Sequence, residues 1–113
     1  MHLLNWFRRT IRTSRWTREQ AHRWATHYFP QHERVAAIVA ETLVTQLGVS
    51  FNSLRPDIRL TEDLGMDDLE PAQVVIALEH EFALSIPDAD CERLATVADL
   101  VRYLHERVTH NAA

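Results

Sequence analysis

Residues 62–70 read Glu62-Asp63-Leu64-Gly65-Met66-Asp67-Asp68-Leu69-Glu70. Two adjacent carboxylates, Asp67 and Asp68, precede a run of apolar residues at helical spacing. Either carboxylate can accept hydrogen bonds from the free amides of a first helical turn, where its negative charge is favoured by the helix dipole. Pro71 falls within that first turn, where its missing N–H costs little. The stretch predicts a helix that begins at Asp67 or Asp68 and ends near Ala83.

Further helices are predicted on both sides of this one. Apolar residues at intervals of three and four predict a helix over 32–47, and Gly48 is well placed to end it. The long connection 49–66 has four spaced apolar residues, so we expect it to lie across the bundle. After a break at Ile86-Pro87-Asp88, with Asp88 as a cap, a short helix and a final helix capped by Thr96 follow. The predicted fold class is all-α.

The composition indicates one small intracellular domain. The chain has 113 residues and a single cysteine, Cys91, which excludes an internal disulfide and fits a reducing cytosol. No apolar run approaches the ~20 residues that span a bilayer, and the start lacks the apolar region of a secretion signal. The predicted location is therefore cytoplasmic.

Charge divides the chain into two parts. Residues 1–30 carry a net charge of +5 and residues 31–113 a net charge of −9, which together give the formal −4. Pro30 stands at the change, and the residue before a proline is biased out of helix. We therefore expect a basic N-terminal helical extension over 1–30, rich in Trp and Arg, and a separate acidic domain over 31–113.

Several interpretations of this extension stay open. Its two short amphipathic helices pack on the body, or they dock with another protein through Trp6, Trp16 and Trp24, because Trp and Arg are favoured interface anchors. Contact with a membrane surface and a mitochondrial presequence are further alternatives. Nucleic-acid binding is not expected, because the acidic body repels phosphates.

No catalytic or metal-binding residues are predicted. None of the seven histidines pairs at the i, i+4 spacing of a helical metal site. The acidic residues at 62–70 are interpreted as a solvated turn, and no nucleophilic side chain has an evident general base. The chain is not expected to be an enzyme.

The body resembles the acyl carrier proteins, the carriers that attach phosphopantetheine. The matching residues are Leu47-Gly48-Val49, Glu62-Asp63-Leu64-Gly65, Asp67, Leu69, Ala77-Leu78-Glu79, Glu81-Phe82, Ile86-Pro87-Asp88, Thr96-Val97 and Tyr103. The resemblance implies a four-helix bundle with a long first loop and a short third helix. It also implies an acidic second helix that docks on basic partner surfaces, and a core that can open for an acyl chain.

One departure from the family concerns its attachment serine. Where the family reads Asp-Ser-Leu, this chain reads Asp67-Asp68-Leu69. An aspartate cannot form the phosphodiester, so we expect no phosphopantetheine cofactor. Two interpretations of Asp68 stay open: it is only a helix cap, or its charge imitates the phosphodiester. Gln73 and His80 also stand where well-known members carry acids, which weakens docking through charge.

The sequence therefore predicts a carrier-like module that docks with, or regulates, an enzyme of fatty-acid, polyketide or lipid metabolism by non-covalent contact. One alternative is a working acyl carrier protein in which Asp68 replaces the attachment serine, and another is a structural subunit anchored by its N-terminal arm. The residues expected to meet the partner are Asp67, Asp68, Leu69, Glu70, Gln73, Ile76, Glu79, His80, Trp6, Trp16 and Trp24.

Overall fold

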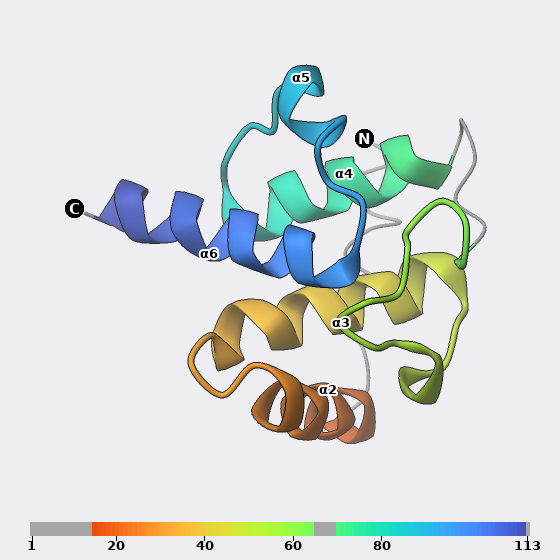
Figure 1. Cartoon of the computed structure of the whole chain (residues 1–113). Helices are drawn as coiled ribbons and strands as arrows, with labels where there is room; N and C mark the ends of the chain where they lie inside the picture. The colour runs from red at the N-terminus through yellow and green to blue at the C-terminus, as the bar shows by residue number, and fades with distance from the viewer. Residues whose placement is uncertain (1–14, 65–69, 113) are drawn as a thin grey trace.

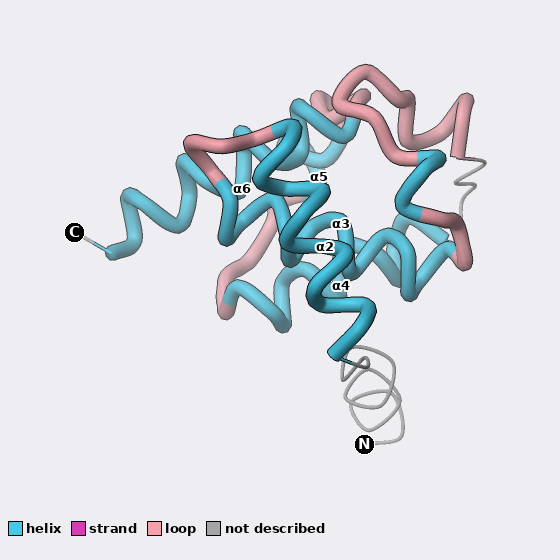
Figure 2. The backbone as a smooth tube through the Cα atoms, turned by 90° about the horizontal axis from the view of Figure 1, so that it is seen from below, coloured by secondary structure: helices cyan, strands magenta, loops and turns pink. Residues whose placement is uncertain are grey.

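A computed structural model describes residues 15–64 and 70–112 of the chain (Figure 1). Every regular segment in these ranges is helical, as Figure 2 shows, which confirms the all-α prediction. The elements are α2 (Arg15–Tyr28), α3 (Glu33–Leu47), the 3-10 turn η1 (Phe51–Ser53), α4 (Glu70–Phe82), α5 (Asp88–Cys91) and α6 (Val97–Ala112). The predicted start of the second bundle helix at Asp67 or Asp68 and the first predicted helix of the extension lie outside the described residues.

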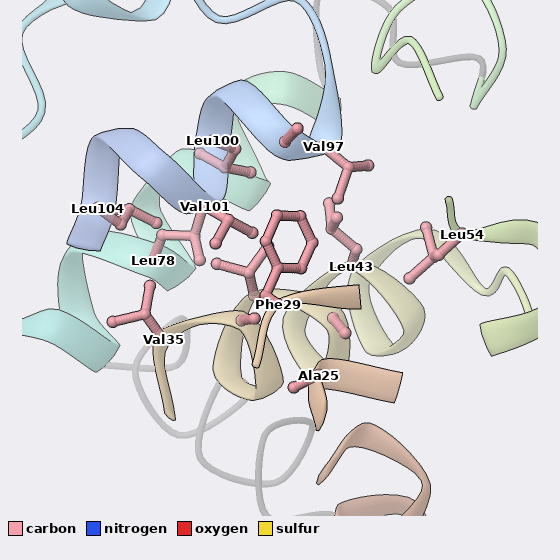
Figure 3. Packing of buried hydrophobic residues seen from close by; sticks show 14 of the residues in the cluster. Ala25, Phe29, Val35, Leu43, Leu54, Leu78, Val97, Leu100, Val101 and Leu104 are labelled. Atoms are coloured by element: carbon pink, nitrogen blue, oxygen red, sulfur yellow. The ribbon is translucent and has the colours of Figure 1, made fainter. Parts of the chain in front are cut away.

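Helix α3 forms the centre of the fold. It lies between α2 on one side and α4 and α6 on the other (Figure 1). Its buried positions recur at helical spacing and contact the buried side chains of α4 and α6, which together form one hydrophobic core (Figure 3). The largest side chains that are almost fully buried in this core are Leu43, Leu54, Leu78, Leu104, Val39, Val74, Val97 and Val101.

Helix α2 packs on the body and contributes to the same core. Ala21, Trp24 and Ala25 are buried at intervals of three and four residues, and Phe29 is buried directly after the helix. The Trp24 Nε1–H donates a hydrogen bond to the carbonyl oxygen of Leu54 at 2.8 Å, which ties α2 to the first loop of the body. Of the interpretations of the extension, the structure shows packing on the body for α2.

The long connection after α3 lies across the bundle, as its spaced apolar residues predict. The amide of Leu60 donates to the carbonyl of Ala95 at 2.9 Å, and the amide of Val97 donates to the carbonyl of Ile58 at 3.0 Å. These bonds fix the connection beside the start of α6. The buried residues of the connection are Leu54, Ile58 and Leu60.

The helix ends agree with the sequence at two points and differ at a third. Gly48 follows α3 with φ of 70°, the left-handed conformation that glycine accepts most readily. Thr96 caps α6, because its hydroxyl oxygen accepts the amide of Asp99 at 3.1 Å. Asp88 was expected to cap α5. It is instead the first residue of that helix, and Pro87 holds the capping position without a side-chain hydrogen bond.

We expect Asp99→Ala to lower the free energy of unfolding by about 0.5–2 kcal/mol, the usual range for lost capping hydrogen bonds at a helix N-terminus. Asp99 Oδ2 accepts the amides of both Ala95 and Thr96 at 3.1 Å, and alanine leaves these donors without that acceptor. Urea denaturation followed by circular dichroism measures the change. Arg102→Ala is the control, since it removes only the exposed ion pair with Asp99 at 3.7 Å. Equal losses in the two variants would contradict the capping role.

Candidate functional site

The outward face of α4 is the candidate docking surface. Val74, Ala77 and Leu78 are buried against the core. Gln73, Ile76 and His80 are exposed, and their spacing of three and four residues places them on one side of the helix. Ile76 is 40% exposed, although most large apolar side chains of the described chain are covered. We call Gln73, Ile76 and His80 the α4 face.

Glu79 was expected to meet a partner, but its carboxylate forms a hydrogen bond within the protein. Its Oε2 accepts the amide of Ile86 at 2.7 Å, which holds the connection from α4 toward α5 against the helix. The side chain is half-buried, so this carboxylate contributes less to a free surface than its position on α4 suggests.

Glu81 does not belong to the α4 face either. It is half-buried and lines a small cavity of about 280 Å³ together with Arg18 and Glu41, so it lies toward α2 and α3. Burial raises the pKa of its carboxyl group, His80 lowers that pKa, and the charge of Glu41 raises it further. The exposed residues in the described part of α4 therefore include no carboxylate.

Four other residues expected at a partner surface precede this face in the chain. Asp67, Asp68 and Leu69 lie outside the described residues, and Glu70 is the first residue of α4.

The three tryptophans expected at a partner surface differ in their surroundings. Trp24 is only 6% exposed and donates its indole N–H to a carbonyl within the protein. It therefore lies in the core, which corrects the expectation that it meets a partner. Its size and its hydrogen-bond donor both favour burial once a carbonyl partner is within reach. Trp16 is 65% exposed, and Trp6 lies outside the described residues.

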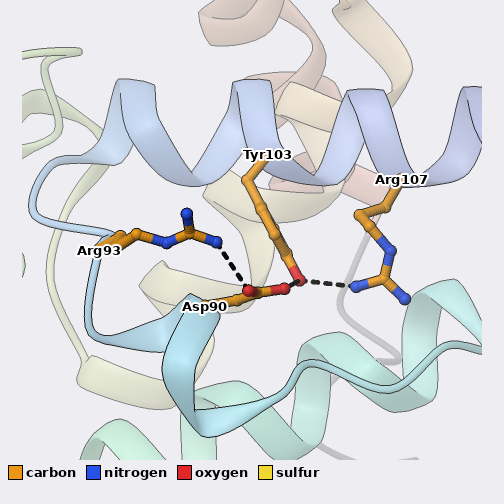
Figure 4. A network of polar contacts seen from close by, with 4 residues as sticks. All are labelled: Asp90, Arg93, Tyr103 and Arg107. Carbon is orange, nitrogen blue, oxygen red and sulfur yellow. Dashed lines mark hydrogen bonds and ion pairs between the residues drawn. The ribbon is translucent and has the colours of Figure 1, made fainter.

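A polar network joins α5 to α6 (Figure 4). The Tyr103 hydroxyl donates to Asp90 Oδ2 at 2.6 Å, and Arg93 donates to Asp90 Oδ1 at 2.8 Å. Arg107 donates to the Tyr103 oxygen at 2.6 Å. The bond from Tyr103 is the largest influence that holds the pKa of Asp90 below its usual value. Burial, followed by the bond to Asp90, raises the pKa of Tyr103.

The sequence interpretation missed this network. Spacings of three residues from Asp90 to Arg93 and of four from Tyr103 to Arg107 are typical of interacting polar pairs on a helix, and they are the signal that was available. The contact that joins the two pairs depends on how α5 folds back on α6.

The described residues offer no metal site and no membrane span. Within 15–64 and 70–112, no three histidine, cysteine, aspartate or glutamate side chains are grouped so that they could hold a metal ion. Over the same ranges, no helix has both the length and the apolar character needed to cross a membrane. Burial and then the charge of Asp88 raise the pKa of Cys91, so its less nucleophilic thiol form is favoured.

The sequence of the chain is similar to those of known carrier proteins. The family model described as "Phosphopantetheine attachment site" matches residues 37–104. The acyl carrier protein of Wolinella succinogenes is 41% identical over 66 residues, 58% of this chain and 87% of the relative. That of Helicobacter hepaticus is 42% identical over 72 residues, 64% and 90% of the two chains. That of Chloroherpeton thalassium is 32% identical over 75 residues, 66% and 94% of the two chains.

These comparisons correct the cofactor expectation drawn from the sequence. The expectation was that no phosphopantetheine is involved, because Asp68 is an aspartate. The matched model is one for phosphopantetheine attachment, and the relatives are acyl carrier proteins, so the comparisons point to a phosphopantetheine prosthetic group. Position 68 falls inside the matched residues and outside those that the structure describes.

Proposed function

The chain belongs to the acyl carrier protein family, whose members are carriers rather than enzymes, and from this premise we propose that it docks with acyl-processing enzymes through the α4 face. The contact with the enzyme is non-covalent. The partners that fit this proposal are enzymes of fatty-acid, polyketide or lipid metabolism, and the expected location is the cytoplasm.

The observation that carries the proposal is the exposure of Ile76. A single exposed apolar side chain is common on protein surfaces. Here it lies between two exposed polar residues, on the helix whose first residue follows the acid-rich sequence 62–69. A central apolar anchor with a polar rim is the usual arrangement of a protein interface.

The charge of the α4 face suggests how docking depends on salt. Gln73 is uncharged, and Glu79 and Glu81 are half-buried. Interface charges mainly set the rate of encounter, and salt screens exposed charges. Docking through Ile76 is therefore expected to respond to salt less than docking through a row of exposed acids.

Ile76→Asp is expected to weaken docking at least tenfold, because a charged group replaces an apolar anchor, and such anchors contribute about 1–2 kcal/mol or more. A phosphopantetheinyl transferase is a suitable probe, since the matched family is one of attachment sites. Biolayer interferometry with the whole chain gives the dissociation constant.

The matched control for this experiment is Tyr28→Asp. It introduces the same charge at an apolar residue of α2 that is 37% exposed, close to the 40% of Ile76. Thermal melts of both variants verify that they are folded. Unchanged binding of Ile76→Asp would contradict docking through the α4 face. Binding that is lost only in Tyr28→Asp would assign docking to the N-terminal extension, as expected for a structural subunit anchored by its arm.

A further inference from the structure

An open cavity of about 650 Å³ lies between α5 and α6, and none of its lining residues belongs to the α4 face. Its volume falls within the range of about 300–1,000 Å³ that is typical of small-molecule sites. Arg93 follows α5, while Tyr103, Arg107 and His110 belong to α6, and all four residues line the cavity. Guanidinium groups from two separate parts of the chain therefore line the same cavity.

Both arginines keep hydrogen-bonding capacity. Arg93 uses one nitrogen to bind Asp90, and Arg107 uses one to bind the Tyr103 oxygen. A guanidinium carries five N–H donors in a planar fork, which matches the oxygens of carboxylates and phosphates. The network of Figure 4 thus orients both groups while other N–H donors remain for a ligand.

Two carboxylates also line the cavity. Both oxygens of Asp90 accept hydrogen bonds, one from Arg93 and one from Tyr103, so its charge is largely compensated. Glu106 is exposed, and water screens its charge. The two guanidinium charges balance these two carboxylate charges, and each arginine keeps N–H donors beyond the one used in the network, so an anion can be bound through hydrogen bonds.

The cavity also has an apolar part. Leu94 is half-buried and lies at the edge of the core, and the Tyr103 ring lies beneath the Arg107 guanidinium at 5.6 Å from its centroid. An aliphatic or aromatic group would cover Leu94 and the ring, and an attached anionic group would meet the arginines.

We propose that the α5–α6 cavity binds a small organic molecule through a carboxylate or phosphate group that accepts hydrogen bonds from the remaining N–H donors of Arg93 and Arg107. The family match and the proposed docking face do not assign this site. A ligand that contacts both arginines would link α5 to α6 more firmly than the network does alone.

Isothermal titration calorimetry of the whole chain tests the proposal with three probes: inorganic phosphate, phenyl phosphate and benzoate. We expect at least one of the two aromatic probes to bind more tightly than inorganic phosphate, because the ring covers Leu94 and Tyr103. Tighter binding of phenyl phosphate identifies a phosphate ester as the ligand class, and tighter binding of benzoate identifies a carboxylate.

Arg93→Gln and Arg107→Gln are each expected to weaken binding of the preferred probe at least tenfold. Arg102→Gln is the matched control, since Arg102 lies on the same helix, is exposed and does not line the cavity. Equal affinities in all four proteins, or no measurable binding of any probe to the unaltered chain, would overturn the proposal. Thermal melts ensure that only folded variants are compared, and neither result depends on docking through α4.

Discussion

Phe29→Ala is expected to lower the free energy of unfolding by about 3–5 kcal/mol, the usual loss when a buried phenylalanine is truncated. The Phe29 side chain is 8% exposed and points into the core (Figure 3). Its ring also contacts Trp24, with ring centroids 5.6 Å apart. Domains of this size are stable by only about 5–15 kcal/mol, so a large part of the total would be lost. Urea denaturation measures the change.

Tyr28→Ala is the control for this prediction. The two aromatic residues are neighbours and both lie close to Trp24, but Tyr28 is 37% exposed, so less apolar surface returns to water. We expect a loss of about 1 kcal/mol or less for this variant. If Phe29→Ala remained within about 0.5 kcal/mol of the unaltered chain, the end of α2 would not be part of the core in solution.

Phe29 also shows which features of the fold could not be predicted from the sequence. The apolar period predicted α3 to within one residue of its bounds and placed the glycine that ends it. The charge difference and Pro30 favoured a boundary at residue 30, and that division of the chain stays a prediction. Spacing along a helix shows that one face is apolar, but it does not show which surface covers that face. The burial of Trp24 and Phe29 depends on how α2 packs against the body, so it could not be predicted from the spacing.

The candidate site, too, could be predicted from the sequence only in part. The sequence interpretation included Gln73, Ile76 and His80 among the residues expected to meet a partner, and all three are exposed on one side of α4. It did not predict that Glu79 would accept the amide of Ile86, because this contact depends on how the chain turns after α4. Ala83 makes that turn with φ of 52°, a conformation that a residue other than glycine adopts uncommonly. No glycine marks the place in the sequence, so the left-handed conformation of Ala83 could not be predicted, although the end of the helix near this residue was.

Asp68→Ser is expected to gain the mass of one phosphopantetheine group when incubated with coenzyme A and a phosphopantetheinyl transferase. The change completes the family's Asp-Ser-Leu at 67–69, within the residues that match the attachment-site model. A hydroxyl at this position can form the phosphodiester. Serine and aspartate are near-equal helix caps, so the fold should be retained. Intact-mass spectrometry reads the result.

Asp68→Ala is the control, because it removes the carboxylate without supplying a hydroxyl and should gain no more mass than the unaltered chain. Peptide fragmentation of every modified protein locates the group, which separates position 68 from Ser50, Ser53 and Ser85. A carrier protein already known to accept the group verifies the transferase. If Asp68→Ser stays unmodified while that carrier is modified, position 68 is not the attachment position. If it is modified at position 68, a hydroxyl at this position is sufficient for the transferase to attach the group.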